Sequence, residues 1–98
     1  MTKQKIYISG PMTGIPEYNR PEFNRVAQEL EAKGYDVINP ASLPDGFEYV
    51  DYIFIAKISI LKCDAMYLLK NWEDSEGAKI EIIHYLTICE NPCIIKQT

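Results

Sequence analysis

The chain has 98 residues, of which 47% are hydrophobic and 24% are charged, values that are ordinary for a folded domain and argue against disorder. This length supports one hydrophobic core but not separate catalytic and substrate domains, so we expect a single domain over residues 1–98. The net charge of −4 comes with scattered basic residues, which argues against duplex nucleic acid as a partner.

We expect neither a membrane-spanning segment nor a signal peptide. No apolar run approaches the roughly 18 to 20 residues that cross a bilayer, and residues 1–5 lead straight into a strand-like segment. We therefore expect a cytoplasmic protein with no membrane partner. Cys63, Cys89 and Cys93 lack CxxC spacing, so we expect neither a disulfide framework nor a metal site.

Short β-rich runs alternate along the chain with longer segments of helical period, which is the pattern of βα units around a parallel sheet. Residues 5–9 are the first predicted strand, and residues 35–38 are the second. Between them, apolar residues recur at spacings of three and four. This predicted helix starts near Pro21, which suits a first helical turn, and ends at Gly34, which suits a C-terminal cap.

The second half of the chain repeats this alternation. Residues 49–62 form the second predicted helix, and residues 65–69 are a continuous apolar run typical of a central strand buried on both faces. A third helix, capped at Asp74 or Ser75, precedes a last strand over residues 93–95. The order β-α-β-α-β-α-β predicts an α/β fold of the Rossmann/flavodoxin-like kind, a three-layer sandwich with a four-stranded parallel sheet and helices on both faces.

Ligands of such sheets bind beyond the carboxyl ends of the strands, near the point where the strand order reverses. Residues 9–14, 39–46 and 70–77 are expected at that edge. The first of these segments has two glycines and two hydroxyl side chains directly after a strand, where backbone N–H groups can approach a phosphate or a sugar. It is neither a Walker A loop nor a GxGxxG motif, and an ordinary strand-to-loop turn is an equal alternative.

The third segment combines a helix N-terminus with an unexpected carboxylate. Residues 74–78 should start a helix whose free N–H groups and dipole favour an anion. Glu81 follows near the edge of the buried arc, where its charge is disfavoured, so it is either the satisfied partner of a nearby tyrosine or a functional group. His84 is expected on the surface of this helix. Trp72 either stacks on a base or packs in the core.

Four segments in chain order carry a more specific signal: YISGPMTG at 7–14, NP at 39–40, CDA at 63–65 and WEDSEGAKIE at 72–81. Taken together they resemble the nucleoside 2-deoxyribosyltransferase-like superfamily, most closely its small, largely uncharacterised bacterial and phage branch. The resemblance covers nearly the whole chain.

This resemblance implies cleavage or transfer of the N-glycosidic bond of a nucleoside or its 5'-monophosphate, with no metal or redox cofactor. By position, Glu81 is the nucleophile and Tyr7 orients its carboxylate. A carboxylate can attack the anomeric carbon of a deoxyribose, whose transition state is oxocarbenium-like, and form a covalent glycosyl-enzyme intermediate. The implied substrate-binding residues are Ser9, Gly10, Met12, Thr13, Gly14, Asn39, Trp72, Ser75 and Gly77.

Position 56 departs from the pattern of the superfamily. Relatives usually carry an Asp there that acts as a general acid or binds a sugar hydroxyl, whereas this chain has Ala56. Glu48 would face the same side if the second helix began early enough. Because a missing general acid costs about 10² to 10⁴ in rate, the alternatives are a slow enzyme, a non-catalytic module that binds a nucleotide or ribosyl ligand, and a structural or interaction role.

The resemblance also bears on assembly. Relatives complete their pockets with residues from a neighbouring chain, which implies a homodimer or a higher even homo-oligomer. A nucleoside or nucleotide is the expected small-molecule partner. The sequence does not select the base, the sugar, a requirement for the 5'-phosphate, or water over a second base as acceptor.

Overall fold

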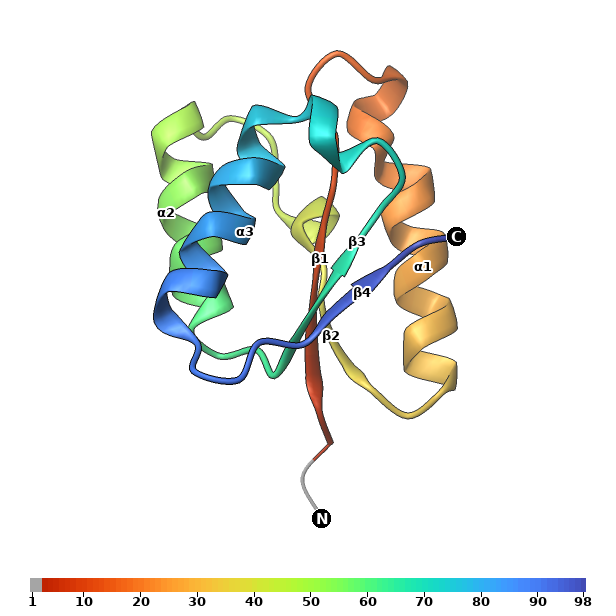
Figure 1. Ribbon diagram of the computed structural model, residues 1–98. Coiled ribbons are helices and arrows are strands. Elements are labelled where there is room, and N and C mark those ends of the chain that lie inside the picture. Colours follow the sequence, from red (N-terminus) through yellow and green to blue (C-terminus); the bar gives the residue numbers. More distant parts are fainter. Residues whose placement is uncertain (1–2) are drawn as a thin grey trace.

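The computed structural model describes residues 3–98 (Figure 1). Its strands are β1 (Lys5–Ser9), β2 (Asp36–Ile38), β3 (Ala65–Leu68) and β4 (Ile94–Lys96). Its α-helices are α1 (Arg20–Ala32), α2 (Tyr49–Ile60) and α3 (Glu76–Ile88), and short 3-10 turns cover Pro16–Asn19, Pro40–Ser42 and Trp72–Asp74. The predicted α/β fold and the order of its elements are confirmed, with small shifts at the ends of the elements.

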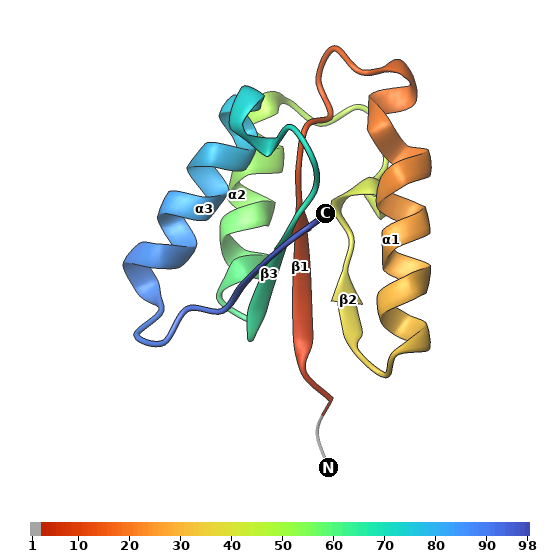
Figure 2. The same cartoon turned by 45° about the vertical axis from the view of Figure 1, so that its right-hand side comes forward.

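The sheet has the strand order β2-β1-β3-β4, and each pair of neighbouring strands is parallel. β1 continues through α1 to β2 on one side, whereas β3 continues through α3 to β4 on the other, so the strand order reverses between β1 and β3. α1 covers one face of the sheet, and α2 and α3 cover the other (Figures 1 and 2). These are the three layers of a Rossmann/flavodoxin-like fold.

α1 forms where the hydrophobic period predicted it. Pro21 lies in its first turn, where the missing N–H costs no helical hydrogen bond. Gly34 follows the helix with a φ of 97°, which glycine adopts without strain. The buried side chains of the helix are Phe23, Val26, Ala27 and Leu30.

β1 separates two apolar cores. Ile6 and Ile8 are buried in the core that contains the inner residues of α1, whereas Tyr7 belongs to the core shared by α2 and α3. Successive side chains of a strand point to opposite faces, so Ser9 lies on the same side as Tyr7. β1 therefore brings two hydroxyl groups to the face that carries α3.

The loop after β1 lies directly against the loop after β3. The N–H of Leu69 donates to the carbonyl oxygen of Ser9 at 2.9 Å, and a Cβ added to Gly10 would lie only 2.7 Å from the Cβ of Leu69. No side chain fits in that space, so packing alone requires a glycine at position 10. The resemblance predicts a binding role for Gly10, and this contact gives the residue a structural reason as well.

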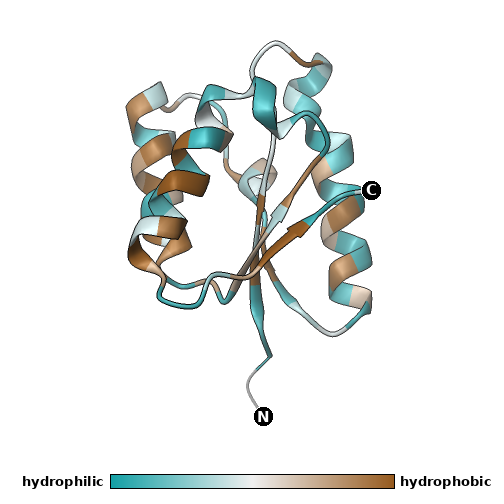
Figure 3. Ribbon diagram, viewed as in Figure 1, coloured by the Kyte–Doolittle hydropathy of each residue, from teal (hydrophilic) through white to brown (hydrophobic). Residues whose placement is uncertain are grey.

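α2 carries apolar side chains on both its inner and its outer side, and Figure 3 shows brown positions along its whole length. Ala56 and Ile60 are buried, yet Val50 and Phe54 are exposed. Within residues 3–98, no helix combines the length and the apolar character that spanning a bilayer requires.

Candidate active site

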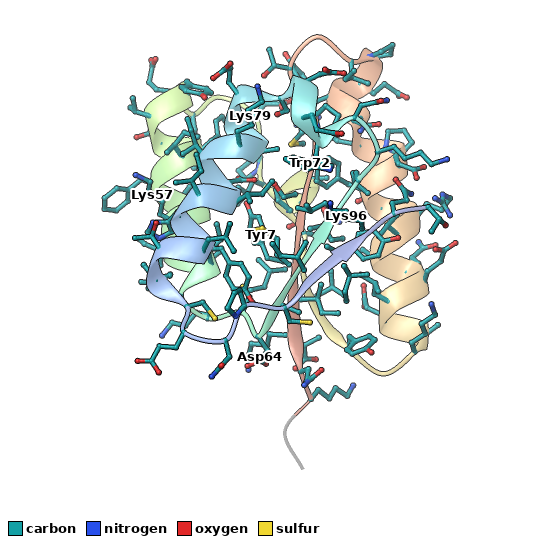
Figure 4. All side chains as sticks on the ribbon, viewed as in Figure 1. Tyr7, Lys57, Asp64, Trp72, Lys79 and Lys96 are labelled. Carbon is teal, nitrogen blue, oxygen red and sulfur yellow. The ribbon has the colours of Figure 1, made fainter. Side chains whose placement is uncertain are left out.

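The carboxylate of Glu81 lies at the end of β1. Its Oε2 accepts a hydrogen bond from the Tyr7 hydroxyl at 2.7 Å, and its Oε1 accepts one from the Ser9 hydroxyl at 2.6 Å. Figure 4 shows Tyr7 in the space between β1 and α3. The structure thus brings together the two predicted catalytic residues. It also gives Ser9, predicted as a substrate-binding residue, a bond to the carboxylate that the sequence analysis missed.

Burial governs the electrostatics of this group. Tyr7 is 2% exposed and Ser9 is 1% exposed, and Glu81 is half-buried. Burial raises the pKa of Glu81 above its ordinary value, although the hydrogen bonds from Ser9 and Tyr7 lower it in part. Burial, followed by the nearby charge of Glu81, raises the pKa of Tyr7 well above that of a free tyrosine. Tyr7 therefore stays protonated and donates at neutral pH.

The arrangement leaves Glu81 able to react. A carboxylate offers about four lone-pair positions, and the two hydroxyl groups occupy one on each oxygen. Neither donor carries a positive charge, and within residues 3–98 no Lys, Arg or His forms a salt bridge with Glu81. The carboxyl group is thus held in position without an ion-pair partner among these residues, which suits a nucleophile or a base more than a structural ion pair.

α3, the helix that carries Glu81, begins at Glu76. Ser75 caps it, because its Oγ accepts from the N–H of Ala78 at 3.1 Å. Gly77 has no positive φ, and an added Cβ would meet only the Ser75 Oγ, at 3.9 Å. The fold therefore does not require a glycine at position 77, although glycine in a helix costs roughly 0.5–1 kcal/mol relative to alanine. A role that needs uncovered backbone N–H groups would explain the residue.

A hollow of about 240 Å³ lies where the strand order reverses. Its polar lining includes Lys70 and Gln97, and the Gln97 Oε1 accepts from the N–H of Lys70 at 2.8 Å. Sequence reasoning missed Gln97 because it reaches this edge only when β4 pairs with β3. Glu81 is not among the lining residues, which are Pro11, Ile15, Asn19, Glu22, Leu69, Lys70, Asn71 and Gln97.

A larger hollow, of about 480 Å³, lies at the opposite end of the sheet. It is lined by residues around the start of β1 and along β2, together with Glu31 near the end of α1. None of the predicted site residues lines it. Its size therefore does not make it the better candidate, since ligands of such sheets bind beyond the carboxyl ends of the strands.

The loop that follows Gly10 turns toward α1. Met12 is half-buried and packs against the core on the α1 side of the sheet. Thr13 and Gly14 are exposed, and Gly14 has a φ of 84°, a conformation that favours glycine. The loop conformation thus accounts for Gly14, and the binding roles predicted for Met12, Thr13 and Gly14 stay predictions.

Asn39 and Trp72, two further predicted binding residues, have partners within the protein. The Asn39 Nδ2 donates to the Asn24 Oδ1 at 2.9 Å, and the Asn39 Oδ1 accepts from the N–H of Ala41 at 3.0 Å. The Lys96 Nζ lies 5.8 Å from the centre of the Trp72 ring (Figure 4). Trp72 also packs against the core under α2 and α3. Binding of substrate by either residue stays a prediction.

Position 56 belongs to the core. Ala56 is 5% exposed and lies in the same apolar cluster as Tyr7 and Met66. Glu48, considered as a substitute acid, is the exposed N-cap of α2 and thus lies just outside the helix, where its N–H donates to the Asp51 Oδ2 at 3.0 Å. The condition that would bring Glu48 to the side of Ala56, an earlier start of α2, is not met.

His84 differs from the expectation of a surface residue. Its side chain is half-buried, and its Nε2 is fully buried with no hydrogen-bond partner among residues 3–98. A helical wheel places His84 away from the sheet, but the wheel takes no account of neighbouring elements, and α2 packs beside α3. His84 takes no part in the bonds to Glu81.

The chain matches the model of a known family. A family model described as "Domain of unknown function (DUF4406)" matches residues 4–94, so the chain belongs to this family. No curated protein matches the chain. The family match does not test the resemblance to the nucleoside 2-deoxyribosyltransferase-like superfamily, which stays a prediction.

Proposed function

We propose that this member of the DUF4406 family cleaves or transfers the N-glycosidic bond of a nucleoside or a nucleoside 5'-monophosphate, with Glu81 as the nucleophile. One observation carries the proposal. Glu81 is a carboxylate with no positive partner among residues 3–98, and it is raised in pKa by burial and fixed by one hydroxyl group on each oxygen. The resemblance of residues 7–14 and 72–81 to glycosyl-transferring relatives points to the same chemistry.

The proposed reaction has two steps. In the first, an oxygen of Glu81 attacks the anomeric carbon, the bond from that carbon to the base nitrogen breaks, and the base leaves with the bonding electrons and takes up a proton from solvent. In the second, water or another base attacks the same carbon, gives up its proton to solvent and releases the carboxylate. Tyr7 and Ser9 hold the orientation of the carboxylate throughout, which contributes the positioning part of the rate enhancement.

We propose that the helix N-terminus before Glu81 receives the 5'-phosphate when one is present. The Ser75 Oγ already accepts from Ala78, so its hydroxyl proton is free to be donated to a ligand. The uncovered backbone at Gly77 and the positive end of the α3 dipole favour an anion.

A second candidate function is a non-catalytic module that binds a nucleotide or ribosyl ligand at the same place. The burial of Ala56 favours it, because the position that carries the acid in relatives is here part of the apolar core. Departure of the base without a general acid would be slower by about 10² to 10⁴. In this alternative the ligand stabilises the fold by mass action, and no base is released.

The test is incubation of the purified protein with deoxynucleosides, ribonucleosides and their 5'-monophosphates, with free base measured by chromatography. Glu81→Ala should abolish base release. Glu90→Ala is the matched control, since Glu90 is an exposed carboxylate just beyond the other end of the same helix, and it should leave the rate unchanged. Equal base release by the wild type and Glu81→Ala would refute the nucleophile.

The binding alternative makes a different prediction for the same compounds. A ligand that raises the melting temperature while no base appears would identify the module rather than the enzyme. Thermal shift in each incubation therefore separates the two functions. We also propose that the protein acts as a homodimer or a higher even homo-oligomer in either case.

A further inference from the structure

The outer side of α2 carries a continuous apolar stripe. Val50, Phe54, Ile58 and Leu61 follow one another at spacings of four, four and three residues, so they lie in one line along the helix. They are 70%, 66%, 48% and 63% exposed, respectively. We call these four residues the outer ridge of α2. Since the inner side of the same helix is also apolar, α2 has the pattern of a helix that is covered on all sides.

The size of the ridge points to a protein partner. Its four side chains present on the order of 500 Å² of apolar surface, which is comparable with the largest patches on typical monomers. A stable interface needs about 800 Å² from each partner. The exposed ring of Phe47, just before α2, adds to this area. The ridge therefore supplies the larger part of the area that a standard interface needs.

We propose that the outer ridge of α2 is the central contact of a two-fold homodimer of this chain. In a two-fold interface the same surface must fit itself. When two copies of α2 are set antiparallel, with the axis midway between Phe54 and Ile58, each Phe54 meets Ile58 of the second copy. Each Val50 then meets Leu61 of the second copy. The ridge is thus self-complementary, and every apolar position along it has an apolar partner.

The charges beside the ridge fit the same arrangement. Asp51 and Lys62 lie on one flank of the ridge, and the antiparallel setting brings each Asp51 beside Lys62 of the second copy. Lys57 lies on the other flank close to the axis, where the two copies of Lys57 approach each other and extend their long stems toward solvent. Two opposite-charge pairs therefore accompany one like-charge pair, which favours this partner and this orientation.

The inference does not depend on the proposed enzyme activity, because mass and catalysis are measured separately. The inner side of α2 packs against the cluster that contains Tyr7. A second copy on the outer side would cover the helix that forms one wall of that cluster. The dimer would then be part of the stable fold and not an occasional contact.

The experiment is a measurement of molar mass by sedimentation equilibrium from about 1 to about 100 µM, a range that spans typical dimer affinities. The wild type should be a dimer, and Phe54→Glu should raise its dissociation constant on the order of 100-fold. Ile83→Glu is the matched control, because Ile83 on α3 is 64% exposed but lies outside the ridge, and it should stay dimeric. Far-ultraviolet circular dichroism checks that both variants are folded.

Two charge variants keep the proposal testable even if Phe54→Glu fails to fold. Lys62→Glu should weaken the dimer several-fold, since it places two acidic groups together, whereas Lys57→Gln should leave it equal or tighter. A monomeric wild type at 100 µM, on the order of the weakest useful affinity, would overturn the proposal. Dissociation by Ile83→Glu but not by Phe54→Glu would place the contact on α3 and overturn it as well.

Discussion

Two buried tyrosines, Tyr7 and Tyr85, lie in the core under α2 and α3. The hydroxyl group of Tyr85 binds backbone groups, whereas that of Tyr7 binds a side-chain carboxylate. At the amino end of the sheet, Tyr85 donates to the carbonyl oxygen of Asp64 at 3.1 Å and accepts from the N–H of Cys93 at 2.9 Å. Nearer the carboxyl end of β1, Tyr7 donates to the carboxylate of Glu81 at 2.7 Å. Figure 4 labels Asp64 at the lower end of the sheet and Tyr7 above it, between β1 and α3.

The different partners give the two tyrosines different roles, one in the fold and the other in the proposed site. Tyr85 joins two backbone groups that would otherwise be unpaired, so its bonds hold the end of α3 to the strands. Tyr7 instead holds a charge in a place where burial opposes it, which lowers stability unless something is gained elsewhere. Burial raises the pKa of both hydroxyl groups, that of Tyr85 to about 12, so both remain donors at neutral pH.

When each tyrosine is replaced by phenylalanine, the two variants should differ most in the rate of base release. Tyr7→Phe removes one of two donors that orient Glu81, so base release should fall by about 10- to 100-fold, as for other supporting residues around a reactive group. Tyr85→Phe should leave the rate per folded molecule unchanged. Initial rates of base release at saturating substrate measure both. An equal fall in the two variants would show that Tyr7 acts through stability alone.

Both variants should also lose stability, for different reasons. Tyr85→Phe leaves the N–H of Cys93 and the carbonyl of Asp64 without their partner, a loss of roughly 1–3 kcal/mol. Tyr7→Phe removes one hydrogen bond to a carboxylate, a loss of roughly 1.5–3 kcal/mol. Urea unfolding at neutral pH gives both free energies. A variant as stable as the wild type would show that the bonds of that tyrosine do not contribute to the fold.

Substitution of two glycines by alanine should have smaller effects, and these effects should again differ between the proposed site and the fold. Gly77→Ala should stabilise the fold by about 0.5–1 kcal/mol, because the added methyl group makes only an ordinary contact with the Ser75 Oγ, at 3.9 Å. It should also weaken binding of a 5'-monophosphate more than binding of the matching nucleoside. Gly10→Ala should instead destabilise the fold, by about 1–3 kcal/mol, since Leu69 must move. Thermal unfolding with and without ligand measures each; unchanged phosphate affinity in Gly77→Ala would refute its binding role.

The free energy of unfolding should depend on pH in a way that reports the ionisation of Glu81. The folded pKa of Glu81 is raised, so the folded state binds the proton more tightly than the unfolded state, whose Glu pKa is about 4.3. Stability contributed by the protonated form is therefore present below about pH 4.3 and is lost as pH rises through the folded pKa. Compared with Glu81→Gln, the wild type should lose stability across that window.

Unfolding free energies of the two proteins, measured at intervals from about pH 4 to about pH 8, test this directly. The subtraction removes the opposite trend from Glu22, whose pKa is lowered to about 2 by its hydrogen bonds from Arg25 and Gln97. A difference between the two proteins that does not change with pH would contradict the raised pKa of Glu81.

The fold was predictable from sequence because its information is periodic and local. The apolar spacing after Pro21, the unbroken apolar run at 65–69 and the cap at Ser75 each mark one element, and the crossover rule then orders them. The ends of β2 and β4 were less predictable, since a strand of three residues is too short to show a clear alternation of apolar and polar side chains. Their limits depend on pairing with β1 and β3.

The site was predictable only in part, because contacts between elements are not periodic. Glu81 was identified as a carboxylate out of place, and Tyr7 came from the resemblance. The role of Ser9 had a usable signal, since residues 7 and 9 must share one face of a strand, but its partner on α3 required the packed structure. The same limit explains His84, whose burial comes from outside its own helix.

The hydrogen bonds to Glu81 also help to fix the register of β1 in the sheet. Tyr7 and Ser9 alternate with Ile6 and Ile8, so a slip of β1 by one residue would present isoleucines to the carboxylate and two hydroxyl groups to the core under α1. Both faces of the strand would be mismatched at once. The site therefore excludes shifted pairings of the central strand, and an insertion within β1 would be tolerated far less than one in the exposed loop around Thr13.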